Sequence, residues 1–120
     1  MGERQVWVRL AALSGFLSVA AGAFAAHNLT DPLAKEWMRT GANYEGMHAL
    51  AALLAVLLLP QPPRARLPAA LFLSGSVVFS GTLYAMALGA PHWLGAITPL
   101  GGLSLLGGWA TLAWMARSAG

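Results

Sequence analysis

The chain contains no cysteine. This absence excludes a disulfide framework, a thiolate metal site, covalent c-type haem attachment and thiol redox chemistry. Charged residues are also scarce: they make up 9% of the chain, and only four residues are acidic, whereas soluble globular domains are about 25% charged. A soluble domain of this size would need far more polar surface. The shortage of charge therefore excludes an ordinary water-soluble protein.

The sequence also lacks the motifs of the common catalytic sites. It has no nucleophile elbow, no phosphate-binding loop and no pair of aspartates. The net charge of +3 comes from basic residues that stand singly or in pairs at the ends of apolar segments, a distribution that does not indicate nucleic-acid binding. We therefore expect a protein that is not an enzyme, has no nucleic-acid partner and carries no cofactor.

Four long apolar segments account for most of the chain. Hydrophobic residues make up 58% of the sequence, and the mean hydropathy is +0.63. Each segment can cross a bilayer as a helix of about 18–22 residues. The sequence predicts an all-α integral membrane protein, one membrane domain with four transmembrane helices in an antiparallel bundle. The predicted spans are residues 6–26, 42–59, 67–88 and 94–115.

The connector between the first two spans has a helical pattern of its own. Thr30 or Asp31 can cap a helix, and Pro32 fits the first turn. Four apolar residues follow at helical spacing: Leu33, Ala34, Trp37 and Met38. We expect a short interfacial helix here. The alternative is one bent helix that runs through Gly41 into the second span.

The other connectors and the basic residues predict the topology. Residues 60–66 are rich in proline, which predicts a loop, and residues 89–93 predict a tight turn. The first and third connectors together contain two basic residues, Lys35 and Arg39, whereas the amino terminus, the second connector and the carboxyl terminus together contain five. This excess places both termini in the cytoplasm. The five arginines are Arg4, Arg9, Arg64, Arg66 and Arg117.

A secretory signal is a competing interpretation of the amino-terminal segment. Arg4 and Arg9 precede an apolar run that ends in Ala23-Phe24-Ala25, which resembles a small-residue cleavage site. The run is long for a signal core, so we favour a retained helix.

The second span carries two ionisable residues. Its wholly apolar part, residues 49–59, covers only about 16 Å as a helix, roughly half of the hydrocarbon thickness. A helix that crosses there takes Glu45 and His48 into the membrane, and such groups mark a candidate site. We expect the two to share a helix face within two turns of the outer surface. The other polar residues expected at this level are His27, Asn43, Tyr44, Tyr84 and Thr98.

This cluster has three interpretations. His48 paired with Glu45 or Tyr84 would fix the register of the helices by hydrogen bonding. His27, Glu45 and His48 could instead be the ligands of a metal ion, or the two histidines could hold a haem. A small transporter or pore component would line an outward-facing polar cavity with the same residues and Tyr84.

Small residues at a spacing of four predict close helix contacts. The three pairs are Ser18 and Gly22, Val77 and Gly81, and Ser104 and Gly108. These faces make a structural or accessory membrane protein the leading functional hypothesis, with the bilayer and either a second copy or a larger membrane complex as partners. A polar stripe at the same spacing fits either a helix contact or a narrow solvent path: Ser76, Ser80 and Tyr84.

Three sequence motifs occur at residues 22–27 (GAFAAH), 44–50 (YEGMHAL) and 98–102 (TPLGG). Over nearly its whole length the chain resembles the membrane protein family called domain of unknown function 423, which is similar to the animal transmembrane protein 256. The resemblance implies a four-helix protein of the bacterial inner membrane and no established activity. The chain departs from the family's pattern at Ala25 and Asn28, where glycine is common, and Glu45 is outside that pattern. The implied motif positions are His27, Tyr44, His48, Tyr84 and Thr98-Pro99.

Overall fold

The computed structural model describes residues 2–59 and 62–117. These residues form α1 (Glu3–Asn28), α2 (Pro32–Leu58), α3 (Pro62–Ala87), a short 3₁₀ helix η1 (His92–Ala96) and α4 (Thr98–Ala116), and no strand occurs in these two stretches. All four α-helices are long and apolar enough to cross a membrane, the last one together with η1. The prediction of an all-α protein with four such helices is confirmed.

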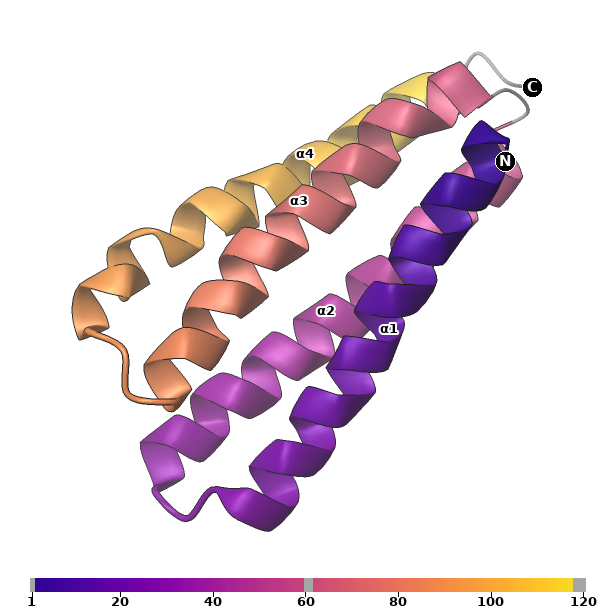
Figure 1. Cartoon of the computed structure of the whole chain (residues 1–120). Coiled ribbons are helices and arrows are strands. Elements are labelled where there is room, and N and C mark those ends of the chain that lie inside the picture. The colour runs from indigo at the N-terminus through magenta and orange to yellow at the C-terminus, as the bar shows by residue number, and fades with distance from the viewer. Residues whose placement is uncertain (1, 60–61, 118–120) are drawn as a thin grey trace.

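The two middle helices of the chain are also the middle helices of the structure. Figure 1 shows α2 and α3 side by side, with α1 against α2 and α4 against α3. The outer helices α1 and α4 share no extensive contact within the described chain. The start of α1 and the end of α4 lie at the same end of the molecule (Figure 1). The helices therefore form an open arrangement with two outer flanks.

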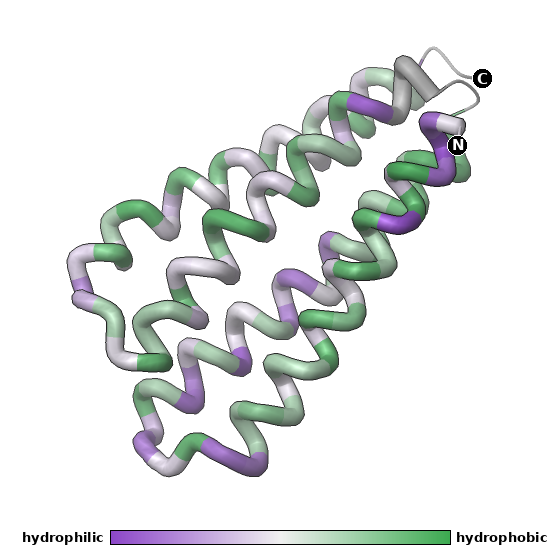
Figure 2. Tube along the Cα trace, in the orientation of Figure 1, coloured by the Kyte–Doolittle hydropathy of each residue, from purple (hydrophilic) through white to green (hydrophobic). Residues whose placement is uncertain are grey.

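The flanking helices differ sharply from the central pair in burial. Within the most apolar part of each helix, 50% of the residues of α2 and 39% of those of α3 are buried, against 11% for α1 and 17% for α4. Large apolar side chains such as Phe16 and Val19 face outward. Hydrocarbon is as apolar as these side chains, so their exposure fits a bilayer. Figure 2 shows hydrophilic residues mainly at the helix ends and along α2.

Two apolar clusters occupy opposite ends of the interior. Alanine dominates both clusters, and its small side chain lets the helices approach closely. The larger cluster contains Ala11, Ala51, Ala52, Val56, Leu59, Ala69 and Phe72. The smaller one contains Ala25, Ala34, Met38 and Ala87. The buried polar residues of α2 and α3 lie between the two clusters along each helix. They are Glu45, His48, Ser76 and Ser80.

The helix α2 is continuous from Pro32 to Leu58. Its first turn is capped as predicted, because the Asp31 side chain accepts a hydrogen bond from the Ala34 N–H at 2.9 Å. The separate interfacial helix is not present, and the alternative of one helix running through Gly41 is what the structure contains. Packing explains this: Ser80 Oγ donates to the Gly41 carbonyl at 2.7 Å, and the Tyr84 ring lies where a Cβ of residue 41 would be. This contact with α3 needs a glycine at position 41 within the helix.

Two further boundaries differ from the predicted ones. The expected loop 60–66 is helical from Pro62 onward, because proline fits the first turn, where its missing N–H needs no partner; residues 60–61 lie outside the described residues. The expected start of the fourth helix at residue 94 falls within η1, and α4 begins at Thr98 with Pro99 in its first turn. Gly89, with a φ of 107°, lies in the turn that follows the end of α3 at Ala87.

Candidate functional site

Glu45 lies in the interior and ties three helices together. It is only 7% exposed. Ser14 of α1 donates a hydrogen bond to Glu45 Oε2 at 2.9 Å, and the Tyr84 hydroxyl of α3 donates to Oε1 at 2.8 Å. Ser14 is near the midpoint of α1, so Glu45 is opposite the middle of that helix. The helix α2 begins ten residues before the predicted span at residue 42, so Glu45 is also near the middle of its own helix, and its expected position within two turns of the outer surface stays a prediction.

His48 is buried on a different side of α2. Its Nδ1 lies 2.7 Å from the Tyr44 carbonyl oxygen, and Trp109 of α4 donates its indole N–H to Nε2 at 3.1 Å. A carbonyl only accepts hydrogen bonds and an indole nitrogen only donates them. The geometry therefore places one proton on the ring, at Nδ1, and uses both ring nitrogens.

Aromatic rings enclose the His48 imidazole. The ring centroids of Phe72, Trp109 and Tyr44 lie 5.6, 5.9 and 6.1 Å from that of His48. Phe72 and Trp109 also pack edge to face at 5.0 Å. This packing joins α4 to the central helix pair around a histidine that has no free hydrogen-bonding position.

The structure does not pair Glu45 with His48. A separation of three residues rotates a side chain by about 60° around a helix, and here that rotation decides which neighbour each one meets. Glu45 contacts α1 and α3, whereas His48 contacts α4. The predicted pairing of His48 with Glu45 or Tyr84 is wrong, since Tyr84 bonds to Glu45 instead.

The remaining candidate residues are dispersed. Thr98 shares a hydrogen bond of 2.6 Å with Thr82 and not with the Glu45 group. Tyr44 is half-exposed and packs on Phe79 at 4.7 Å. Asn43 and His27 are exposed. Among the seven predicted residues, the structure therefore joins Glu45 with Tyr84 and His48 with Tyr44.

The ligand set expected for a metal ion or a haem is not assembled. Ser14 lies opposite Glu45, and His27 is more than three helical turns further along α1. In residues 2–59 and 62–117 no three His, Cys, Asp or Glu side chains lie close enough together to hold a metal ion.

The predicted small-residue pairs behave differently from one another. Ser18 donates to the Ala42 carbonyl at 2.8 Å, and Ser104 donates to the Leu71 carbonyl at 2.9 Å. Gly22 and Gly108 lie close to Ala42 and Phe72 of the neighbouring helices. These two pairs form helix contacts. Val77 and Gly81 do not: Val77 is 73% exposed, and no atom lies within 4 Å of a Cβ placed at Gly81.

The polar stripe of α3 forms a helix contact with α2. Ser80 bonds to the Gly41 carbonyl and Tyr84 bonds to Glu45. Ser76 is 2% exposed, and its hydroxyl is the buried side-chain group without a hydrogen-bond partner in the described part of the chain. Two of the three residues bond across the α2–α3 interface and the third is buried, which favours the helix contact over the solvent path.

Sequence reasoning missed four residues that contribute to the site and its packing. Ser14 lies one turn from Ser18 on the same helix face, a signal that was available. Trp109 needed a hydrogen-bond partner if buried, but only the fold could supply His48. Gly75 and Gly101 let α3 and α4 approach closely, because a Cβ at Gly101 would overlap the backbone of α3.

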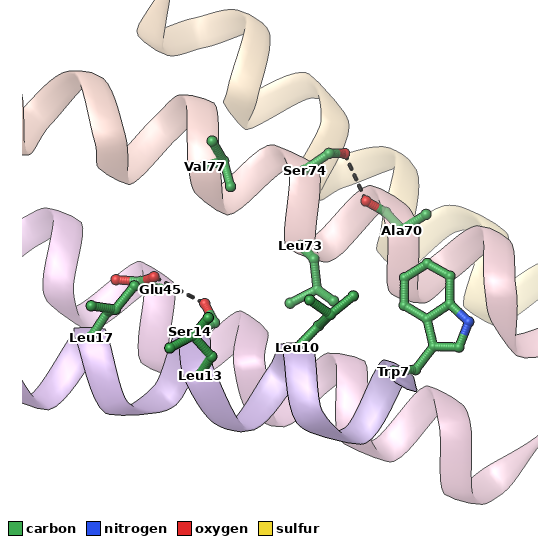
Figure 3. A pocket seen from close by; sticks show the side chains of 10 residues that line it. All are labelled: Trp7, Leu10, Leu13, Ser14, Leu17, Glu45, Ala70, Leu73, Ser74 and Val77. Carbon is green, nitrogen blue, oxygen red and sulfur yellow. Dashed lines mark hydrogen bonds between the residues drawn. The ribbon is translucent and has the colours of Figure 1, made fainter. Parts of the chain in front are cut away.

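Two apolar grooves flank α2. The first lies between α1 and α3, has a volume of about 400 Å³ and contains Ser14 and Glu45; Figure 3 shows both among leucines of the two helices. The second lies between the central pair and α4 and has a volume of about 530 Å³. Its lining includes His48, Trp109, Met47 and Phe79.

Comparison with known proteins identifies the family to which the chain belongs. The family model described as "Protein of unknown function (DUF423)" matches residues 21–102. The chain belongs to the DUF423 family. A UPF0382 membrane protein of Haemophilus influenzae is 44% identical over 112 residues, which are 90% of each chain.

Two further relatives of this DUF423 protein come from a yeast and a bacterium. A UPF0382 membrane protein of Schizosaccharomyces pombe is 41% identical and covers 89% of this chain and 97% of its own. The UPF0382 inner membrane protein YgdD of Escherichia coli is 41% identical, with 85% and 82% covered. No solved structure matches the chain. These matches confirm the resemblance seen in the sequence and identify a membrane protein family.

Proposed function

We propose that this DUF423 protein is a non-enzymatic structural or accessory component of the bacterial inner membrane. Its four helices cross the bilayer as an antiparallel bundle, with both termini in the cytoplasm. The observation that supports this proposal is that polar side chains in the interior form hydrogen bonds between helices. Glu45 links α2 to α1 and α3, and His48 links α2 to α4. These links make one unit of four helices whose flanks are free for association.

The outer faces of α1 and α4 are the proposed association surfaces. Phe16 and Val19 of α1 are 71% and 74% exposed, and Leu106 and Trp114 of α4 are similarly open. In lipid the association of helices depends on close packing and not on hydrophobic burial. Rigid apolar faces of this kind suit a second copy or the subunits of a larger membrane complex.

Photo-crosslinking in cells tests the association. A photoreactive amino acid at position 16 or 106 is expected to give a crosslinked dimer or a crosslinked partner, while the same group at Ala52, which is buried, gives neither. The purified protein in nanodiscs should then be larger than one chain by native mass spectrometry. A strict monomer without any crosslinked partner would remove the proposal.

The absence of cysteine makes the orientation easy to test. Single cysteines are introduced by Gln5→Cys, at the start of α1, and by Ala90→Cys, in the connection after α3. An impermeant maleimide should label position 90 in intact cells and position 5 only in inverted vesicles. The reverse pattern would overturn the proposed topology.

Transport is a second candidate function. The observation that favours it is that Glu45 lines a groove and is not sealed within the interior. The protein in proteoliposomes would then conduct a solute flux that Glu45→Gln abolishes. Equal flux from the wild type and from this variant would remove the candidate.

A further inference from the structure

We propose that the groove between α1 and α3 binds a lipophilic monovalent cation, with the charge at Glu45 and the apolar body along the groove walls. Binding of a cation in this groove requires neither association with a partner nor transport of a solute, because residues of this chain alone form the groove.

The walls of the groove suit an apolar body. Leu10, Leu13 and Leu17 of α1 face Leu73 and Val77 of α3 (Figure 3). Val77 is 73% exposed and Leu13 is 56% exposed, so the groove opens sideways, where the bilayer would lie. Its volume of about 400 Å³ falls within the usual range for small-molecule sites, roughly 300–1,000 Å³. A ligand already dissolved in lipid could enter without crossing water.

The floor of the groove supplies the charge. Each Glu45 oxygen accepts one hydroxyl hydrogen bond, and a carboxylate oxygen has room for a second. In the described chain the ion pair found is the one between Arg66 and Glu3, and no basic side chain lies within ion-pair distance of Glu45. An unpaired carboxylate in an apolar setting is costly. A cation in the groove would supply the missing countercharge.

Other occupants fit less well. An anion would be repelled by Glu45, and a neutral acyl chain would cover the walls but leave the carboxylate unpaired. A calcium ion needs six to eight oxygen ligands, which one carboxylate and two hydroxyls do not provide. Trp7 also lines the groove, and an indole face attracts cations. The second groove is larger, yet its His48 has both nitrogens occupied, so it offers no countercharge.

A pair of probes with opposite charge tests the proposal. Tetraphenylphosphonium and tetraphenylborate have nearly the same size and shape, so apolar burial contributes equally to both. Titration calorimetry of the detergent-solubilised full chain should show saturable binding of one phosphonium per protein, with tetraphenylborate at least about tenfold weaker. Equal affinity for the two probes, or no saturable phosphonium binding, would overturn the proposal.

Matched variants locate the binding site. Glu45→Gln should weaken phosphonium binding at least about tenfold, while Glu36→Gln, which removes the same charge from an exposed position on α2, should leave it unchanged. Val77→Trp should also weaken binding by filling the groove with the carboxylate intact. Val19→Trp is the matched control: it adds a tryptophan at an exposed position on α1 that does not line the groove, and it should leave phosphonium binding unchanged.

Unchanged binding in both Glu45→Gln and Val77→Trp would place the cation elsewhere and refute the inference. If Glu45→Gln fails to fold, Val77→Trp alone decides, because Val77 makes no interior contact that the fold requires. Crosslinking at position 106 on α4 should be unaffected by either variant. Failure of cation binding and failure of the association proposal are therefore separate results.

Discussion

Two ionisable residues lie on different sides of α2, and they differ in how many of their hydrogen-bonding positions the fold fills. Glu45 is at the floor of an open groove and accepts one hydrogen bond on each oxygen. His48, three residues further along, has both nitrogens bonded and three aromatic rings around it. Both are buried to a similar degree. Burial alone therefore does not distinguish a residue that completes the fold from one that is open to a ligand.

The difference arises from the number of hydrogen bonds that each side chain can make. A singly protonated imidazole has one donor and one acceptor, and the fold uses both. A carboxylate has about four acceptor positions, and the described chain fills two of them. A groove lies on each side of α2. We infer that His48 has only a structural role, because its hydrogen-bonding positions are filled, and that Glu45 is open to a ligand. Four variants test this contrast.

Gly101→Ala should have the largest effect, because it disrupts the His48 side as a whole. The added Cβ would overlap the backbone of Phe79 and approach the Gly75 carbonyl oxygen, so α4 would have to move away from α3. We expect a loss of about 3 kcal/mol in the free energy of unfolding, measured by denaturant titration in mixed micelles. Gly81→Ala, where the added carbon meets no atom within 4 Å, is the control. Equal stability of the two variants would contradict the close packing of α3 and α4.

His48→Leu should have the next largest effect. The substitution leaves the Trp109 N–H without its acceptor. Trp109 is 44% exposed, but in a bilayer the exposed side of a span meets hydrocarbon and not water, and an unsatisfied donor without water costs about 1–3 kcal/mol. We expect a loss of about 2 kcal/mol in the free energy of unfolding, within that range. In the Trp109→Phe background the same substitution should cost clearly less, since the donor is already gone. Additive losses would show that the two residues are not coupled.

Glu45→Gln should have a small effect on stability. The amide oxygen can accept one of the two hydroxyls and the amide nitrogen can donate to the other, so we expect a change below about 1 kcal/mol in the free energy of unfolding. Glu45→Leu, which removes both hydrogen bonds, should be clearly more destabilising. If Glu45→Gln lowered the free energy of unfolding as much as His48→Leu does, both residues would have a structural role, and the proposed difference between them would be wrong.

Arg66→Gln should have the smallest effect. Arg66 pairs with Glu3 between α3 and α1 at 2.6 Å, but its side chain is 57% exposed, and exposed ion pairs contribute about 0–1 kcal/mol. We expect a thermal midpoint within a degree or two of the wild type, a shift typical of a few tenths of a kcal/mol. A large loss would mean that this pair, and not the Glu45 hydrogen bonds, holds α1 to α3.

Much of the architecture follows from the sequence alone. Runs of apolar residues of bilayer length predicted four membrane helices, and the Asp31–Pro32 signal predicted the start of α2. These features depend on composition and on short-range hydrogen bonding, which a linear sequence carries directly. The motifs at residues 22–27, 44–50 and 98–102 likewise identified the family before any fold was known.

The partners of Glu45 and His48 were decided only by the tertiary structure. Both residues were recognisable as costly groups in an apolar segment, but a rotation of about 60° around α2 determines that one meets Ser14 and Tyr84 and the other Trp109. That rotation depends on how closely the helices approach, which glycines such as Gly41 and Gly101 permit. The sequence by itself determined which residues must find partners within the membrane. The packing of the helices decided which partners they find, because interhelical distance and rotation are properties of all four helices together.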